Sequence, residues 1–201
     1  MSSSIIEEFM YYLLKDLPKV AAFGEGSKIV LGQTQAYTDM AFLPENFSHF
    51  VEQPGVNISK KNQDFAIAKK VNCTFETNGN KQMFELIVPC VAIEIKTFIP
   101  ITMLGQSDHE ARRLKEGNPN SLYIIVAEQN ALSQAVNLKR LSIDEIFILR
   151  KQKRNSSKNR VADKKPIDSL VVEELYRLVK DFLAAKWYDP QNADAGRLIK
   201  A

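Results

Sequence analysis

Apolar and polar positions follow a helical spacing near both ends of the chain and an extended spacing between them. Residues 4–17 and 168–185 repeat apolar side chains every three to four positions, which predicts an amphipathic helix for each segment. Asp108 is typical of a helix N-cap and predicts a third helix that continues to about residue 116. Residues 100–107 are expected to form the loop before that helix.

Short apolar and β-branched runs fill most of the chain between these helices. Strands are expected within residues 28–43 and over residues 64–68, 71–75, 83–88, 90–99, 122–127 and 143–149, and residues 44–55 are expected to form a loop. Asn78-Gly79 tolerates positive φ in a hairpin turn, so the strands beside it should pair antiparallel. Pro89 lacks an amide hydrogen and predicts a bend or bulge.

The order of these elements predicts the fold class. Residues 122–127 are apolar at nearly every position, which indicates a strand buried on both faces. The length of 201 residues fits one domain, at about 100–200 residues per domain. We therefore expect a single α/β domain over residues 1–201, with a central mixed β-sheet flanked by helices.

Positive charge is concentrated in one part of the chain. The sequence has 27 basic and 24 acidic residues, a formal net charge of +3. Residues 150–165, the basic segment, hold eight basic residues and one acid, so the segment carries +7 and the rest of the chain −4. This distribution predicts contact with a polyanion. A solvated loop is the alternative, because the segment has almost no apolar residue to pack.

The scarcity of cysteine and histidine excludes several classes of site. Cys73 and Cys90 share no CxxC spacing, and His49 and His109 are the two histidines of the chain. A four-cysteine zinc site and a histidine-rich metal hydrolase are therefore excluded. No apolar run approaches the roughly 20 residues that a membrane helix needs. We expect a cytoplasmic protein in a reducing compartment, without a membrane span.

Two charges interrupt the apolar run of residues 90–99. Glu94 and Lys96 lie two residues apart, and side chains at such positions share one face of a strand. Ile93 and Ile95 should occupy the opposite face and anchor the strand in the core. Charges are rarely placed in the middle of a strand unless they are paired, bound to metal or catalytic. A buried structural ion pair and a catalytic site both remain open on this spacing.

A second carboxylate would complete a metal site beside Glu94, and the chain offers two. Asp64 opens the strand before the hairpin, and Asp39 lies in the earlier strand region. Two carboxylates about 4 Å apart repel by something like 4 kcal/mol at an effective dielectric of about 20, so such a pair requires a cation. Two carboxylates and a strand carbonyl, such as that of Ile95, suit Mg²⁺.

This donor set is typical of phosphodiester hydrolysis. The metal would neutralise charge on the scissile phosphate and activate a water, while Lys96 positions that water or stabilises the transition state. Glu8 lies on the first predicted helix. It is either a solvated acid or a third, water-mediated metal ligand.

Asp64 followed by Glu94-Ile95-Lys96 on a strand resembles the PD-(D/E)xK nuclease superfamily. More narrowly, segments along nearly the whole chain are similar to the subunits of BbvCI-type type II restriction endonucleases. The matching segments are Ser4–Phe9, Lys60–Ala66, Ile93–Thr97, Ser121–Tyr123, Ile143–Gln152, Lys158–Val161 and Gly196–Ile199. The resemblance implies a restriction-endonuclease-like fold and an enzyme of a restriction-modification system.

The resemblance also implies roles for particular residues. It assigns Asp64, Glu94 and Lys96 to the catalytic motif, with Gln63 where the motif has proline, and it favours Asp64 over Asp39. It places Glu8 on an N-terminal acidic helix. The cofactor it implies is Mg²⁺, for which Mn²⁺ can substitute. The implied partners are double-stranded DNA and either a second copy of the chain or a related subunit.

Basic residues near the predicted site are candidates for contact with DNA phosphates. They are Lys60 and Lys61 together with Arg150, Lys151, Lys153, Arg154, Lys158 and Arg160 of the basic segment. The leading hypothesis is a Mg²⁺-dependent, site-specific DNA endonuclease. The alternatives are a non-catalytic DNA-binding or partner subunit and a repair-type nuclease of the same fold.

Overall fold

The computed structural model describes residues 3–20, 29–132, 136–154, 164–185 and 187. Its elements are α1 (Ser3–Leu14), α2 (Leu17–Val20), β1 (Ile29–Phe42), α3 (Phe47–Glu52), β2 (Val56–Thr77), β3 (Asn80–Ile99), α4 (Ile101–Gly117), β4 (Leu122–Asn130), the 3₁₀-helix η1 (Leu138–Arg140), β5 (Glu145–Ile148) and α5 (Ser169–Ala184). The five strands form one sheet in the order β1-β2-β3-β4-β5. β1, β2 and β3 pair antiparallel, whereas β3, β4 and β5 pair parallel, so the predicted mixed sheet is confirmed.

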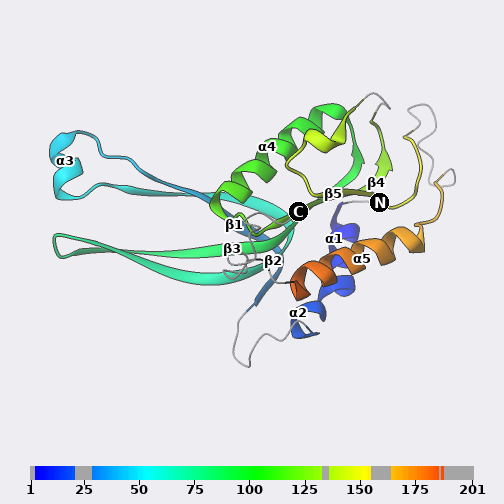
Figure 1. Cartoon of the computed structure of the whole chain (residues 1–201), viewed down its shortest axis with the longest axis horizontal. Helices are drawn as coiled ribbons and strands as arrows, with labels where there is room; N and C mark the ends of the chain where they lie inside the picture. The colour runs from blue at the N-terminus through cyan, green and yellow to red at the C-terminus, as the bar shows by residue number, and fades with distance from the viewer. Residues whose placement is uncertain (1–2, 21–28, 133–135, 155–163, 186, 188–201) are drawn as a thin grey trace, which may run out of the picture.

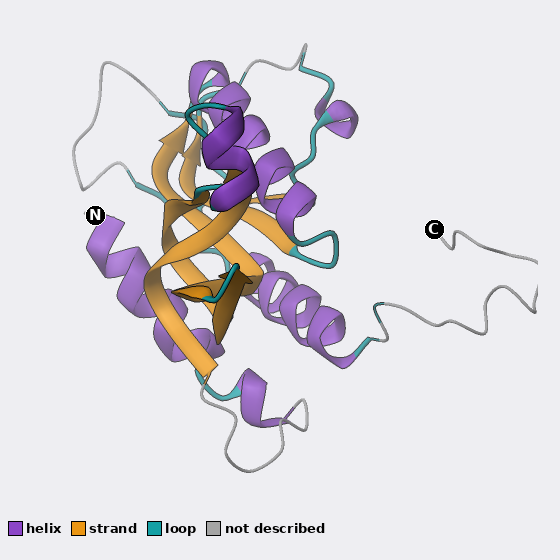
Figure 2. Cartoon of the chain, turned by 90° about the vertical axis from the view of Figure 1, so that its left-hand side faces the viewer, coloured by secondary structure: helices purple, strands orange, loops and turns teal. Residues whose placement is uncertain are grey.

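Helices cover both faces of this sheet. Figure 1 shows α4 on one side and α1 with α5 on the other, and Figure 2 shows the same layers from the side. Side chains of β4 alternate between the two cores, with Leu122, Ile124 and Val126 facing α1 and α5, and Tyr123, Ile125 and Ala127 facing α4. All six are buried, which confirms the strand predicted to be covered on both faces.

β3 divides its side chains in the same way. Ile93 and Ile95 lie in the core beneath α1 and α5, and Ala92 lies in the core beneath α4. Glu94 and Lys96 therefore share the α4 face, as their spacing predicts. Glu94 and Lys96 therefore lie between the sheet and α4.

β2 and β3 are longer than the sequence suggested. The predicted strands 64–68 and 71–75 are parts of one strand, and the turn between β2 and β3 is formed by Asn78 and Gly79 with φ of 51° and 82°. The register shifts where Ala68 pairs with Pro89, which confirms a bulge at the proline. β2 bends so strongly that Val56 and Thr77, near its two ends, line the same cavity.

Two predicted loops contain helices. Residues 47–52 form α3, which lies at the end of the β1–β2 ribbon in Figure 1. Residues 101–107 form the first part of α4, so Asp108 lies inside the helix and is not its N-cap. The Asp108 carboxylate instead accepts a hydrogen bond from the backbone of Ser142. The last predicted strand is shorter than expected, because β5 covers residues 145–148.

Among the described residues, no helix is long and apolar enough to cross a membrane.

Candidate active site

Asp64, Glu94 and Lys96 converge where β2 separates from β3. The pairing of the two strands ends at Phe65 and Ile93, and beyond that point Oδ2 of Asp64 accepts a hydrogen bond of 2.8 Å from the backbone amide of Ile95. The Lys96 ammonium lies 2.8 Å from Oε1 of Glu94 and 3.9 Å from Oδ2 of Asp64. The structure thus brings together the three residues that the sequence singled out.

The environment keeps both partners of the Glu94–Lys96 pair charged. Burial raises the pKa of Glu94, but hydrogen bonds from Lys96, Ser107 and Tyr123 lower the pKa by more than burial raises it. The pKa of Glu94 therefore lies below its ordinary value. Burial lowers the pKa of Lys96, but the carboxylates of Glu94, Asp64 and Glu110 raise it above its ordinary value. At neutral pH the site therefore holds charged carboxylate and ammonium groups.

The site also contains Gln106, Glu110 and Tyr123, which sequence reasoning missed. A cavity of about 200 Å³ is lined by Asp64, Glu94 and Lys96 and by Lys61, Gln106, Glu110 and Tyr123 among others. The Tyr123 hydroxyl donates to Oε2 of Glu94 at 2.8 Å, and Glu110 accepts from Lys61 at 2.6 Å. A tyrosine in an apolar strand and an acid on a helix give no local signal of such a role.

The other two candidate carboxylates lie outside this cavity. Asp39 on β1 is 57% exposed and lies 3.9 Å from Arg113. Glu8 is exposed on α1, a helix that packs through Ile6 and Met10 on the sheet face opposite Glu94. The structure does not bring Asp39 or Glu8 to this cavity, and Asp64 is the second carboxylate beside Glu94.

The donors at this site suit a hard divalent cation. Asp64 and Glu94 both approach the single charge of Lys96. The carbonyl of Ile95 faces the same strand edge as its amide, which Asp64 binds, because both groups of one residue point to one neighbour in a sheet. No group of three His, Cys, Asp or Glu arranged around a common point occurs in the described part of the chain. Mg²⁺ needs only one or two carboxylates, since it keeps several waters.

Comparison with protein families matches residues 1–194 to the model of the Bpu10I restriction endonuclease. The chain belongs to the Bpu10I restriction endonuclease family. Its fold is similar to that of a solved chain from the native BbvCI A2B2 tetramer, with a TM-score of 0.63 and 24% identity over 85% of this chain and 61% of that chain. This chain thus spans less than two thirds of that relative's length. A search of curated proteins gives no match.

In this Bpu10I-family chain, two cations of the basic segment form ion pairs with a buried acid of the sheet. Glu128 on β4 has a side chain only 1% exposed, and it accepts hydrogen bonds from Arg150 at 2.7 Å and from Lys164 at 3.0 Å. Burial raises the pKa of Glu128, but these two cations lower it more, so the pKa lies below its ordinary value. Arg150 is 13% exposed and pairs with Glu128, and its contact with DNA stays a prediction.

The remaining cations of the basic segment differ in their surroundings. Lys151 lies 2.9 Å from Asp168, whose carboxylate caps α5. Lys153 and Arg154 are exposed, and the Arg154 guanidinium stacks 3.5 Å from the ring centre of Phe98. Lys158 and Arg160 lie outside the described residues.

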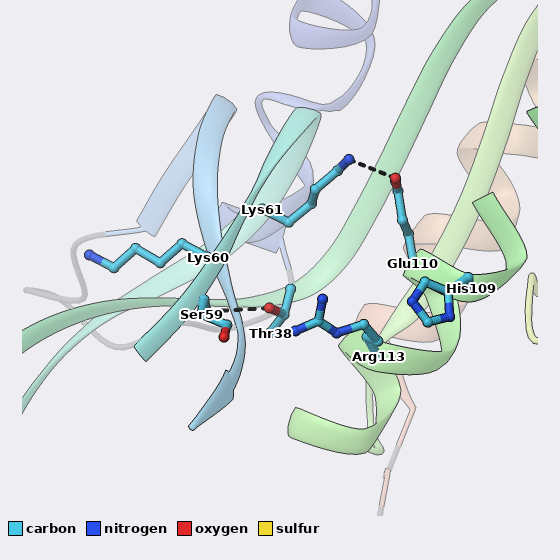
Figure 3. Close-up of a pocket in the computed structure, with 7 residues that line it drawn as sticks. All are labelled: Thr38, Ser59, Lys60, Lys61, His109, Glu110 and Arg113. Carbon is cyan, nitrogen blue, oxygen red and sulfur yellow. Dashed lines mark hydrogen bonds and ion pairs between the residues drawn. The ribbon is translucent and has the colours of Figure 1, made fainter. Parts of the chain in front are cut away.

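Lys60 and Lys61 occupy neighbouring positions of β2 near the cavity that contains Asp64. Figure 3 shows Lys61 reaching towards Glu110 on α4, while Lys60 extends in the opposite direction. Both lysines line a second cavity, and Lys61 also lines the cavity of Asp64. Their position agrees with a role in phosphate contact, which stays a prediction.

Proposed function

We propose that this chain is a catalytic subunit of a type II restriction endonuclease that hydrolyses phosphodiester bonds of double-stranded DNA in a Mg²⁺-dependent reaction. The observation that carries the proposal is the convergence of Asp64, Glu94 and Lys96 in one cavity of a chain from this family. Two carboxylates and one ammonium, held between a strand and a helix, supply what metal-assisted hydrolysis needs.

Asp64, Glu94 and the Ile95 carbonyl would hold the Mg²⁺ ion, for which Mn²⁺ can substitute. When bound, the ion neutralises charge on the scissile phosphate and lowers the pKa of a coordinated water. Tyr123 fixes the orientation of Glu94 through the hydrogen bond to Oε2.

Lys96 contributes a positive charge that persists at neutral pH. Burial lowers its pKa, but Glu94 and Asp64 raise it more, so the side chain stays protonated. The ammonium can donate a hydrogen bond to the attacking water or to a phosphate oxygen on which charge develops. Preorganised donors of this kind stabilise the transition state because they need no rearrangement during the reaction.

Cleavage of both DNA strands requires a second active site. One set of these three residues hydrolyses one strand. The similar solved chain comes from an assembly named an A2B2 tetramer. We therefore propose that this chain acts with a second copy or with a related subunit.

Incubation with plasmid DNA tests the proposal. The purified chain, alone and mixed with a related subunit, should nick or linearise plasmid when Mg²⁺ or Mn²⁺ is present, and EDTA should abolish cleavage. Lys96→Ala should remove cleavage while DNA binding persists. Lys70→Ala is the matched control, because Lys70 is an exposed lysine of β2 that pairs with Glu85 away from the cavity. Intact plasmid in every mixture and with every metal would refute the proposal.

The same variant distinguishes a non-catalytic subunit. If Glu94 and Lys96 form only a structural pair, Lys96→Ala should lower the free energy of unfolding by about 3–5 kcal/mol, as the loss of one partner of a buried pair does. In a nuclease, the cleavage shown by the parent chain should be lost in Lys96→Ala whatever the change in stability, whereas a non-catalytic subunit shows no cleavage in either protein. Cleavage of several defined duplexes, followed by mapping of the ends, separates a site-specific enzyme from a repair-type nuclease.

A further inference from the structure

A second cavity of about 360 Å³ lies next to the catalytic one. Its walls come from β1, β2 and α4, and its polar lining includes Thr38, Ser59, Lys60, Lys61, His109 and Arg113. Figure 3 shows Arg113 reaching from α4 towards Thr38 and Ser59. Lys61 and Glu110 line both cavities, so the two are neighbours across this one ion pair.

Close backbone packing fixes the walls of the second cavity. Gly117, at the end of α4, lies so near β1 that a Cβ atom there would approach the carbonyl oxygen of Thr38 to 2.4 Å. The Thr38 hydroxyl is bonded in turn to the carbonyl of Ser59 on β2, at 3.3 Å. These contacts hold the end of α4 against β1, and β1 against β2, beside the cavity.

The second cavity is lined by cationic hydrogen-bond donors and by one acid, Glu110, whose carboxylate already accepts hydrogen bonds. The Arg113 guanidinium is 43% exposed, and its nearest carboxylate, on Asp39, is 3.9 Å away, which is beyond hydrogen-bond distance. Glu110 is only 14% exposed and already accepts from Lys61 and from Gln106. An ammonium has three donors, so Lys61 can bind a further oxygen while it holds Glu110. This donor set fits an anion with several oxygens.

The distance from the catalytic residues fits the spacing of a DNA strand. Lys61 lies three residues before Asp64 on β2, which corresponds to about 10 Å at about 3.3 Å per residue. Phosphates of one DNA strand follow one another at about 3.4 Å of axial rise. The separation of Lys61 and Asp64 therefore equals about three nucleotides of axial rise, so a strand that ran along β2 from Asp64 would present a further phosphate to the second cavity.

We propose that this cavity binds a non-scissile backbone phosphate of the DNA, with Arg113 as its principal donor and Lys61 beside it. The inference rests on the proposed function and extends it, because it names a contact that positions the strand in the catalytic cavity. Arg113 is a positioning residue, since it touches the DNA backbone and not the reacting atoms.

Arg113→Ala tests the proposal, with Arg112→Ala as its matched control. Arg112 is the neighbouring arginine of α4, is exposed, pairs with Asp108 and does not line the cavity. DNA binding is measured by fluorescence anisotropy against salt concentration in a Lys96→Ala background, so that cleavage does not interfere. Arg113→Ala should reduce the slope of log K against log salt by about 0.9, the value for one phosphate contact, and Arg112→Ala should leave the slope unchanged. Equal slopes for the two variants would overturn the proposal.

Two further measurements separate the possible failures. In the cleaving protein, Arg113→Ala should raise KM by a larger factor than it lowers kcat, and Arg113→Lys should restore most of the salt slope. If inorganic phosphate stabilises the protein through Arg113 while the DNA slope is unaffected, the cavity holds a free anion and the DNA contact is refuted. If the slope depends on Arg113 but the parent chain never cleaves DNA, the phosphate site stands and the proposed nuclease function fails.

Discussion

The hydroxyl of Tyr123 on β4 donates a hydrogen bond of 2.8 Å to Glu94 on the neighbouring strand β3. Tyr123 is fully buried, and its ring lies in the core beneath α4. One side chain thus belongs to the hydrophobic core and lines the cavity of Asp64, Glu94 and Lys96. The position of Glu94 is therefore fixed by the packing that stabilises the fold.

Tyr123→Phe should separate these two contributions. The variant keeps the ring but removes a hydrogen bond to a charged group, which should cost about 1.5–3 kcal/mol of unfolding free energy. If Glu94 binds the metal ion as proposed, loss of the hydrogen bond that supports its carboxylate should lower cleavage about 10-fold or more. Denaturant unfolding and plasmid cleavage measure the two effects. Tyr11→Phe, at an exposed position of α1, is the control and should change neither the unfolding free energy nor the rate of cleavage.

The pH dependence of cleavage should report the charge state of Glu94. Its lowered pKa means that the carboxylate stays charged until the pH falls below the ordinary range for glutamate, and activity should be lost only there. Tyr123→Phe removes one of the hydrogen bonds that lower this pKa, so the acid limb of the profile should move to higher pH. An acid limb at the same pH in both proteins would show that Glu94 does not govern it.

Glu128→Gln should destabilise the protein. The variant leaves Arg150 and Lys164 beside a neutral side chain in a buried site, and loss of one partner of such a cluster costs about 3–5 kcal/mol. Because the pKa of Glu128 is lowered on folding, its stabilisation is present above the unfolded pKa and is lost as the pH falls through the folded pKa. The difference in unfolding free energy should therefore shrink in acid. Glu145→Gln, at an exposed site on β5, should show no such difference.

Arg154 and Lys164 should respond differently to substitution, although both belong to the basic segment. Arg154 is exposed and stacks on Phe98, which shares a strand face with Glu94 and Lys96. We expect Arg154→Ala to reduce the salt slope of DNA binding by about 0.9 with little change in stability. Lys164→Ala should leave the slope unchanged and cost about 1.5–3 kcal/mol, because it removes a hydrogen bond to Glu128. A loss of stability in Arg154→Ala together with a reduced salt slope in Lys164→Ala would contradict this assignment of the two residues.

Gly117→Ala should move α4 away from β1. The added methyl group would lie 2.4 Å from the Thr38 carbonyl oxygen, and overpacking of this kind costs about 1–3 kcal/mol. Gly105→Ala, in the same helix with no atom within 4 Å of its Cβ position, should instead stabilise the protein by about 0.5–1 kcal/mol. If the second cavity binds a phosphate, only Gly117→Ala should also weaken DNA binding.

The sequence predicted the parts of the structure that depend on local pattern. The two-residue spacing of Glu94 and Lys96 placed both on one face, and the Asn78-Gly79 turn set the pairing of β2 with β3. β5 also follows the alternation of a strand, with Phe147 in one core and Ile146 against the other. These features depend on strand geometry alone, which the order of residues determines.

Features that depend on distant contacts were missed. Residues 101–107 contain β-branched residues and a glycine, which favour a loop, but burial of Leu104 and Ser107 against the sheet makes them helical. The charges of Arg150 and Lys164 predicted contact with a polyanion, with a solvated loop as the alternative, because nothing near them in the sequence reveals Glu128. Glu110 joined the site only through the packing of α4 over β2 and β3.

Glu128 holds two cations that lie on either side of residues 155–163. The backbone is also secured on both sides, since the amide of Arg154 bonds to Asn130 at 2.7 Å and the amide of Asp168 bonds to Leu149 at 2.7 Å. A single proteolytic nick between residues 154 and 164 would therefore leave two fragments joined non-covalently at β4. The single carboxylate of Glu128 therefore holds to β4 the described residues before and after this interval.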